Sequence, residues 1–388
     1  MTAAARPTWV VQLTSAGRSA IAVVVVDGPS AVGGVASRFQ PARGGSLREY
    51  PPGTILLGRW GGACGEDLVV CRRGPERVEV HCHGGLAAVA TVMHDLAASG
   101  CRQVPWQQWP GISSDQITRQ ATAALARATT RRTARILLDQ QQGALREALA
   151  AVSQALVRGE PTGARQRLAG ILRHAELGMH LTRSWQVVLG GPPNVGKSRL
   201  LNRLCGYARA IVLDEPGTTR DVVTAATAWN GWPVELADTA GLRSEAGPPE
   251  RQGVQEAESR LAAADLVVLV FDASGTHERA TELLRAAWPD ALWVGNKCDL
   301  VAPPRTARSE QRATIFASAK TGAGIDRLAT AILRRLVPHP PPPGAAVPFL
   351  PEHVRVLRAA SAALVRGETT LAHQALQELL QDDSLRFV

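Results

Sequence analysis

The sequence predicts a multidomain α/β protein. A parallel sheet with helices on both faces is inserted in a helical domain, and a small α+β domain precedes both. Strand-like and helical segments alternate over residues 184–338, which indicates the parallel sheet. Residues 116–183 contain a single proline and are rich in Ala, Leu, Gln and Arg, which indicates helices. Residues 1–115 carry short Val- and Ile-rich segments between Gly and Pro, which is typical of a small α+β domain.

The domain of residues 1–115 is expected to begin with two strands. They lie within residues 8–26, on either side of a polar turn at 15–19. Residues 86–98 have the spacing of an amphipathic helix that ends before Gly100. Further short strands are expected at 54–57, 68–71 and 78–81.

A repeated phrase flanks the α/β segment. SQALVRGE occupies residues 153–160, and SAALVRGE occupies residues 361–368. Either two unrelated helices share a glycine-terminated ending, or both phrases belong to one helical domain. In the second case, that domain comprises residues 116–183, with two or three helices, and residues 345–388.

The α/β segment, residues 184–338, is expected to form the inserted domain. A proline-rich connector at 338–343 follows it, and helical sequence returns over 350–382. The expected strands are 185–190, 232–238, 265–272, 292–297 and 314–319, and the expected helices are 196–205, 277–287 and 324–336.

The phrase GPPNVGKS, which ends at Ser198, follows an apolar strand and precedes a helix. Gly191 and Gly196 allow the tight path that turns backbone N–H groups toward phosphates at a helix N-terminus. Lys197 is expected to reach the β- and γ-phosphates, and Ser198 to bind Mg²⁺. The phrase predicts a P-loop.

Two further phrases match the phosphate end of such a site. DTAG at 238–241 follows a strand, which places Asp238 near the Mg²⁺ and the Gly241 N–H near the γ-phosphate. GTTRD at 217–221 supplies Thr218 and Thr219 as sensors of the γ-phosphate. The predicted Mg²⁺ ligands are Ser198, Thr219 and Asp238.

The phrases NKCD at 296–299 and SAK at 318–320 predict the base specificity. The Asp299 carboxylate can accept both N1–H and the 2-amino group of guanine, a donor pair that adenine lacks. The Ala319 N–H is expected to face guanine O6. The domain is therefore predicted to be a P-loop GTPase domain. The expected nucleotide contacts are Gly191, Asn194, Val195, Gly196, Lys197, Ser198, Arg199, Thr218, Thr219, Asp238, Thr239, Ala240, Gly241, Asn296, Lys297, Asp299, Ser318, Ala319 and Lys320.

All three lysines of the chain lie in these phrases. Lys197 is expected to bind phosphate. Lys297 and Lys320 are expected to lay their stems against the guanine and to contribute little through their charge. The position after the DTAG glycine holds Leu242, which cannot orient water, so hydrolysis needs help from elsewhere.

Composition narrows the function classes. The net charge of +9 leaves two interpretations open: contact with RNA, or Arg-rich solvated helix faces. The six cysteines have no metal-ligand or disulfide-framework spacing, which favours reduced thiols. No segment is long enough to span a bilayer, so we expect a cytoplasmic protein without a membrane partner.

Over residues 187–336, the motifs GPPNVGKSRLLNRL, GTTRD, DTAG, NKCDL and SAKTGAGIDRL resemble the TrmE-Era-EngA-like GTPases. Among these they are most similar to the MnmE (TrmE) family of tRNA-modification GTPases. In the first domain, GRSAIAVVVVDGP and VEVHCHGG resemble that family's folate-binding, dimer-forming domain. The resemblance implies a homodimer whose GTPase domains pair across their nucleotide faces in the presence of K⁺.

The resemblance also implies residue roles. Asn194 would coordinate K⁺, and Glu250 would act through a second water as the catalytic carboxylate, with Lys197 and Gly241. More weakly, the resemblance implies that the first domain binds a tetrahydrofolate derivative, with Arg18, His83 and Gly84 as residues of the binding pocket.

The chain departs from that family's pattern outside the GTPase domain. It ends SLRFV where the family has a Cys-x-Gly-Lys tail, and VPWQQWPGISSD replaces the family's phrase after HGG. The leading hypothesis is a GTPase of tRNA wobble-uridine modification, working with tRNA and an FAD-containing partner. A second hypothesis is a GTP-dependent scaffold or ribosome-associated switch without modification chemistry. An assembly GTPase of the Era or Der type ranks last, because no GxxG loop of a KH-like domain follows.

Overall fold

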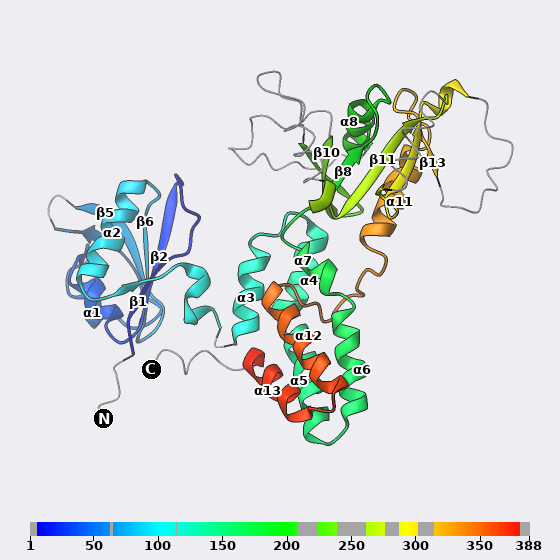
Figure 1. Cartoon of the computed structure of the whole chain (residues 1–388). Coiled ribbons are helices and arrows are strands. Elements are labelled where there is room, and N and C mark those ends of the chain that lie inside the picture. The colour runs from blue at the N-terminus through cyan, green and yellow to red at the C-terminus, as the bar shows by residue number, and fades with distance from the viewer. Residues whose placement is uncertain are drawn as a thin grey trace, which may run out of the picture. The chain divides into compact units, whose positions relative to one another are not determined.

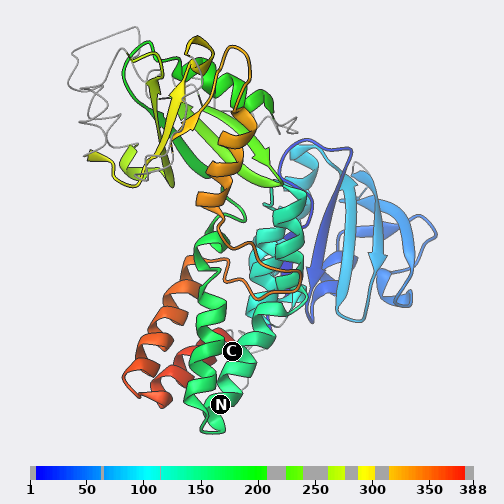
Figure 2. The same cartoon turned by 90° about the vertical axis from the view of Figure 1, so that its right-hand side faces the viewer.

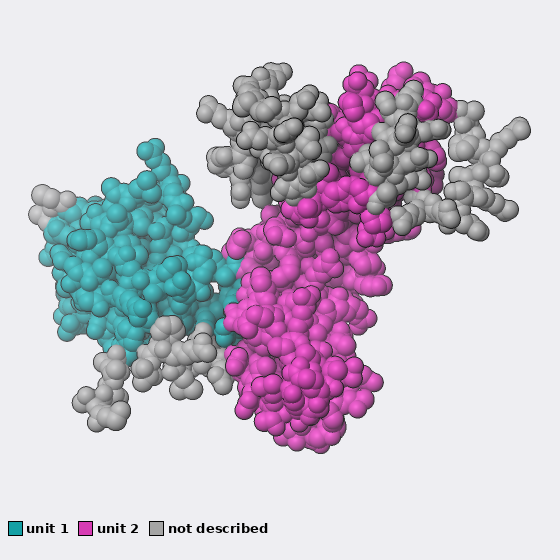
Figure 3. Space-filling view, in the orientation of Figure 1, with its two compact units in different colours: residues 1–123, 380–388 teal, residues 124–379 magenta. Residues whose placement is uncertain are grey.

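A computed structural model describes residues 6–62, 65–113, 115–207, 224–238, 261–275, 287–301 and 314–380. The chain divides into two compact units (Figure 3). One comprises residues 1–123 with 380–388, and the other comprises residues 124–379. No helix in the described ranges is long and apolar enough to cross a bilayer. The five cysteines that the structure describes are free thiols, as their spacing predicts.

The first unit is built on a seven-stranded sheet of order β3-β4-β5-β6-β2-β1-β7. All neighbours pair antiparallel except β1 and β7, which are parallel. The expected strands and the helix are present, and β3 and β7 are additions. Its elements are β1 (Trp9–Gln12), β2 (Ile21–Asp27), α1 (Ala31–Ala36), β3 (Phe39–Pro41), β4 (Ile55–Trp60), β5 (Glu66–Arg72), β6 (Arg77–His83), α2 (Leu86–Ala98) and β7 (Arg102–Gln103).

One face of this sheet packs against α1 and α2 around a core that includes Val24, Val70 and Val80. On the opposite face, Trp109 packs against Trp9 and donates a hydrogen bond to Asp27 at 3.1 Å. The short 3-10 turns Trp106–Gln108 and Pro110–Ile112 make up that cover.

The helices of the second unit come from both sides of the α/β segment. Helix α6 contacts α5 and α12, and Figure 1 shows the three side by side. Ser153 bonds to His373 at 3.1 Å and to Gln377 at 2.9 Å, which ties the two flanking segments together. The α/β segment is therefore inserted in one helical domain. The helices of this unit are α4 (Arg131–Gln141), α5 (Ala144–Val157), α6 (Pro161–Leu172), α7 (Ala175–Met179), α12 (Pro351–Val365) and α13 (Thr369–Leu380), and α3 (Gln116–Leu125) spans the boundary between the two units.

Residues 116–183 hold more helices than the two or three expected. Gly143 and Gly159 each adopt positive φ, at 111° and 77°, and end or begin a helix there. The repeated phrases both lead to such a glycine, Gly159 and Gly367, so the helices share an ending and also a domain.

The inserted segment forms a six-stranded sheet of order β13-β12-β11-β8-β10-β9. Its inner strands pair parallel as expected, but β9 pairs antiparallel with β10. The sheet is therefore mixed rather than purely parallel. The turn explains this: Asn230 and Gly231 both take positive φ, at 49° and 78°, which favours a two-residue hairpin. The strands are β8 (Trp185–Gly190), β9 (Thr224–Trp229), β10 (Trp232–Asp238), β11 (Leu266–Asp272), β12 (Leu292–Asn296) and β13 (Ile315–Phe316).

Two described helices pack on this sheet and contact each other, α8 (Lys197–Tyr207) and α11 (Ile325–Leu336). The helix expected over 277–287 lies outside the described residues apart from Ala287. In chain order, α8 follows β8 directly, so its N-terminus stands at the carboxyl end of a central parallel strand.

Candidate nucleotide-binding site

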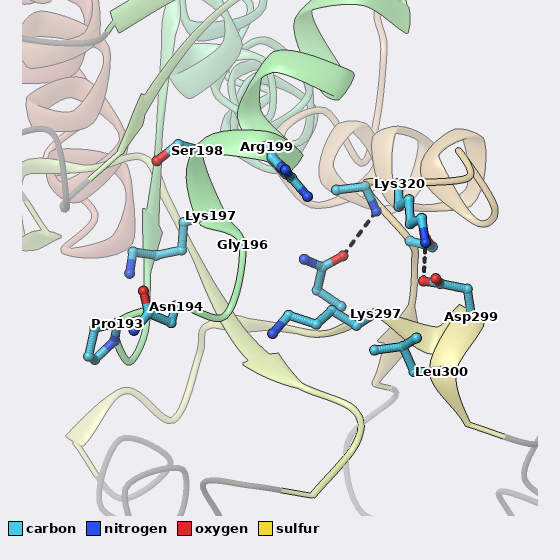
Figure 4. Close-up of a pocket in the computed structure, with 13 residues that line it drawn as sticks. Pro193, Asn194, Gly196, Lys197, Ser198, Arg199, Lys297, Asp299, Leu300 and Lys320 are labelled. Atoms are coloured by element: carbon cyan, nitrogen blue, oxygen red, sulfur yellow. Dashed lines mark hydrogen bonds between the residues drawn. The ribbon is translucent and has the colours of Figure 1, made fainter.

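The carboxyl ends of the parallel strands meet at one edge of the inserted sheet. Asp238 stands opposite Leu189, and Asp272 stands opposite Asn296. A cavity of about 590 Å³ opens there, with the P-loop on one side and the residues after β12 and β13 on the other (Figure 4). Its lining residues are Pro193, Asn194, Gly196, Lys197, Ser198, Arg199, Asn296, Lys297, Asp299, Leu300, Ser318, Ala319 and Lys320.

The P-loop backbone requires its two predicted glycines. Gly191 has φ of 133°, and a Cβ there would lie 2.1 Å from the Val270 carbonyl oxygen. Gly196 has φ of 91°, and a Cβ there would lie 2.5 Å from Nδ2 of Asn296. The loop leads into α8, so helical N–H groups and the positive end of the helix dipole stand beside the cavity.

Lys197 is held inside this loop. Its side chain is largely buried, with the residue 6% exposed. The ammonium donates to the carbonyl oxygens of Gly191 at 3.0 Å and Pro192 at 2.9 Å. The positive charge of Lys197 is thereby fixed against the P-loop backbone, where it can bind anionic phosphate oxygens.

Ser198 and Asp238 come together as the sequence predicts. The Ser198 hydroxyl donates to Oδ2 of Asp238 at 2.5 Å, and Asp238 is 1% exposed. A hydroxyl and a carboxylate are hard oxygen ligands of the kind that Mg²⁺ prefers. These two residues therefore fit a magnesium site beside the phosphates.

Asn296 joins three loops at the base of the cavity. Its amide donates to the Val195 carbonyl at 2.8 Å and accepts from the Ala319 N–H at 3.0 Å. This second bond differs from expectation, because the Ala319 N–H was assigned to guanine O6. That N–H can reach O6 only if the bond to Asn296 is shared or exchanged.

Ser318 orients Asp299. The hydroxyl of Ser318, a fully buried residue, donates to Oδ1 of Asp299 at 2.5 Å. The same hydroxyl accepts from the Thr321 N–H at 3.1 Å, so its rotamer is fixed from two sides. The carboxylate that should recognise guanine is therefore held in place at the cavity wall.

Lys297 has a charge role that the sequence interpretation missed. Its Nζ lies 2.6 Å from Oδ2 of Asp272, a residue that is 7% exposed. The expectation that the Lys297 charge contributes little is therefore wrong. Burial raises the pKa of Asp272, but hydrogen bonds from Lys297 and Ser274 outweigh it and lower that pKa to about 2. The one signal for Asp272 was its position at the end of an apolar strand.

The remaining predicted site residues divide by location. Asn194, with φ of 63°, Arg199 and Lys320 line the cavity. The predictions that fall outside the described residues are Thr218, Thr219, Thr239, Ala240, Gly241, Leu242 and Glu250.

The three folate candidates lie on adjoining segments of the first unit. Ser19, next to Arg18, donates its N–H to the Gly84 carbonyl at 3.0 Å, and a Cβ at Gly84 would lie 2.1 Å from Ser19 Oγ. His83 is bonded through Nδ1 to Glu66 at 2.5 Å, and its side chain is 73% exposed. Glu66 is a neighbour that sequence reasoning did not identify.

Comparisons with known proteins agree with this site. A family model described as 50S ribosome-binding GTPase matches residues 186–297. The tRNA modification GTPase MnmE of Synechococcus sp. (strain WH7803) is 34% identical over 365 residues, which covers 82% of this chain and 78% of that protein. MnmE of Chloroflexus aurantiacus is 32% identical over 411 residues, covering 95% of this chain and 91% of that protein. The chain belongs to the MnmE family of tRNA modification GTPases.

Membership of the MnmE family makes this chain a GTPase that binds GTP with Mg²⁺. The predicted recognition is thus confirmed at the family level. Among solved structures, a GDP·AlF₄⁻ complex of Era from Aquifex aeolicus is 29% identical, covers 45% of this chain and 64% of the Era chain, and has a TM-score of 0.30.

Proposed function

We propose that this GTPase acts in the modification of the tRNA wobble uridine, and that GTP hydrolysis drives a change in the pairing of its GTPase domains. The relatives that cover most of the chain are named tRNA modification GTPases. The observation that carries the proposal is the nucleotide cavity, whose phosphate end and base end are linked through Asn296. A tRNA substrate, a homodimer and an FAD-containing partner belong to the same proposal.

In this proposal, the cavity residues divide the work on GTP. Lys197 and the N–H groups at the start of α8 bind the β- and γ-phosphates. Ser198 and Asp238 hold Mg²⁺, which neutralises charge on the phosphates when bound. Asp299 accepts the two guanine donors and thereby selects GTP over ATP.

Hydrolysis needs a group that directs water, and Leu242 cannot supply it. We assign this role to Glu250, acting through a second water, and the K⁺ site to Asn194. Asn194 lines the phosphate end of the cavity in a left-handed conformation, two residues before Gly196 of the P-loop. The Asn194 side-chain oxygen is a hard ligand of the kind that such a cation takes.

The first unit supplies a surface for a homodimer. Leu57, Val69, His81 and Val23 stand opposite one another across β4, β5, β6 and β2, on the face away from α1 and α2. Ile55 and Leu57 on this face are 68% and 60% exposed. Exposed large apolar side chains on a sheet face are typical of a surface that another chain covers.

The dimer proposal has a matched test. Leu57→Asp should convert the protein to a monomer in sedimentation velocity experiments. Leu86→Asp should not, although Leu86 is 64% exposed, because it lies on α2. Equal sedimentation of both variants with the native protein would contradict this surface.

The tRNA proposal is tested in cells. Deletion of the gene should abolish the modified wobble uridine in tRNA hydrolysates measured by mass spectrometry. The native gene should restore it, and Glu250→Gln should not, although the variant protein still binds GTP. Unchanged wobble uridine in the deletion strain would favour the alternative of a GTP-dependent scaffold or switch.

A further inference from the structure

The second unit contains another cavity outside the nucleotide site. Its volume is about 630 Å³, close to the 590 Å³ of the nucleotide cavity. Its lining residues come from α5, α6 and the turn after it, and the connector of residues 337–350. Figures 1 and 2 show this connector leading from α11 to α12. The proposed function uses none of its residues.

The connector wall of this cavity is fixed by hydrogen bonds. Gln140, a fully buried residue of α4, donates to the Ala345 carbonyl at 3.0 Å and accepts from the Val347 N–H at 3.0 Å. The Gly344 N–H donates to Asp139 at 2.9 Å. These hydrogen bonds hold the connector against α4, although six of its fourteen residues are proline.

The cavity is lined by cationic and imidazole groups. Arg167, Arg173, His174 and His339 contribute to its wall, and no carboxylate does. Within the part of the chain that the structure describes, neither arginine has an ion-pair partner. Arg167 and Gly170 belong to α6, and Arg173 and His174 lie in the turn between α6 and α7. Two unpaired guanidinium groups beside one concave surface favour an anion.

His174 supplies an independent observation. The residue is 7% exposed, and its Nδ1 has no hydrogen-bond partner among the described residues. Buried polar atoms are almost always hydrogen-bonded, so this nitrogen lacks the partner that such atoms usually have. Burial, followed by the charges of Arg173 and His339, lowers the pKa of His174. A neutral imidazole at this position can accept or donate a hydrogen bond, whichever a ligand requires.

The rest of the wall is apolar and consists of Ala148, Ala151, Ile171, Pro338, Pro340 and Pro342. Such a surface suits the non-ionic part of a ligand that also carries an anionic group.

We propose that this cavity binds a phosphate-bearing small molecule of nucleotide size, with its phosphate at Arg167 and Arg173 and its apolar part against the prolines. Arginine forks match phosphate oxygens bidentately, and His174 lies beside them in the cavity wall. The ligand would hold the connector against α6 and thus join the exit of the GTPase domain to the helical domain. This site goes beyond the proposed function and does not depend on it.

The test uses the full chain with GDP and Mg²⁺ saturating the nucleotide site. AMP and pyrophosphate serve as the probes, because Asp299 disfavours adenine and GDP blocks the P-loop. Isothermal titration calorimetry should give saturable one-to-one binding of at least one probe. Binding of AMP alone would indicate a nucleoside phosphate, and binding of both would indicate recognition of phosphate itself.

The variants locate the site. Arg167→Gln and Arg173→Gln should each weaken binding about tenfold, because each removes a charge-assisted contact. Arg165→Gln on the same helix does not line the cavity and should leave binding unchanged. GDP affinity should stay the same in all three, which confirms folding. In NMR of ¹⁵N-histidine protein, the probe should shift the His174 ring signals.

Absence of saturable binding of both probes at millimolar concentration would overturn the proposal. Binding that is equal in Arg167→Gln, Arg173→Gln and Arg165→Gln would also overturn it, because the ligand would then lie elsewhere.

Discussion

Asp272 and Lys297 form an ion pair across two adjacent parallel strands, with 2.6 Å between Oδ2 and Nζ. Lys297 reaches this carboxylate from a left-handed conformation, with φ of 64°, directly after Asn296. The pair therefore anchors the loop that carries Asp299 to the neighbouring strand β11. The base-binding loop is thus held in position by a residue outside the five nucleotide phrases.

Removal of the carboxylate should loosen that loop. We expect Asp272→Asn to lower the free energy of unfolding at pH 7 by roughly 1–2 kcal/mol, and to weaken GDP binding about tenfold. The depressed pKa of about 2 means that the ionised carboxylate stabilises the fold above its unfolded pKa and loses this effect as pH falls toward 2. Urea unfolding and GDP titration measure both effects, with the exposed Asp290→Asn as control. Native GDP affinity in Asp272→Asn would contradict the anchoring role.

Substitution of Asp299 should change the base preference. An Asn side chain can donate to the C2 carbonyl of xanthine, but it cannot accept both guanine donors. We expect Asp299→Asn to bind GDP about 100-fold more weakly and XDP more tightly than the native protein does. Fluorescence titrations with both nucleotides measure this exchange. Weakened binding of both nucleotides to the same degree would mean that Asp299 supports the fold rather than the base.

The β9–β10 turn is clamped to α4. Thr130 Oγ1 donates to the Gly231 carbonyl at 2.7 Å, and the Arg132 guanidinium lies 4.9 Å from the Trp232 ring centroid. Gly231 has φ of 78°, and a Cβ there would lie 2.8 Å from Cβ of Arg132.

Gly231→Ala should therefore lower the free energy of unfolding by about 1–2 kcal/mol. Gly163→Ala, at a helical position with no atom within 4 Å of its Cβ, should raise it by roughly 0.5–1 kcal/mol. If α4 holds the turn in this way, denaturant unfolding will show a lower free energy of unfolding in Gly231→Ala and a higher one in Gly163→Ala. Equal shifts would refute it.

His353 should make the helical domain sensitive to acid. The residue is fully buried beside Phe349, and burial lowers its pKa from 6.5 to about 4. Between pH 6.5 and about pH 4, the His353 imidazole is protonated in the unfolded chain and neutral in the folded chain. Stability is therefore complete above pH 6.5 and falls by up to about 3 kcal/mol as the pH falls to 4.

The measurement is the slope of unfolding free energy against pH. His353→Gln should flatten that slope between pH 6.5 and 4, whatever its effect on absolute stability. The control is His94→Gln, because His94 is exposed and should leave the slope unchanged. A slope that is the same in all three proteins would rule out His353 as its source.

Much of the nucleotide site was predictable because its chemistry needs particular residue types at fixed spacing. Gly191 and Gly196 are required by the backbone path, and Ser198 and Asp238 meet because consecutive strands of a parallel sheet end at one edge. These constraints are local and leave a signature in the sequence.

Residues that act through tertiary contacts leave weaker signals in the sequence. Asp272 acts through the strand beside it, and a single aspartate after an apolar strand has no motif. The antiparallel β9 was signalled by the Asn230–Gly231 pair, but its strand has the weakly apolar sequence TAATAW. Helix boundaries in residues 116–183 depended on which glycines took positive φ, and several of the glycines there do not.

The central claim is that the cavity around Lys197 hydrolyses GTP. Phosphate release from GTP and Mg²⁺ by the full chain, in KCl and in NaCl of equal ionic strength, tests it most directly. We predict hydrolysis that is faster in KCl, near-complete loss in Lys197→Ala, and no change in the control Arg165→Ala. Absence of phosphate release by the native chain in both salts, or an unchanged rate in Lys197→Ala, would contradict the account.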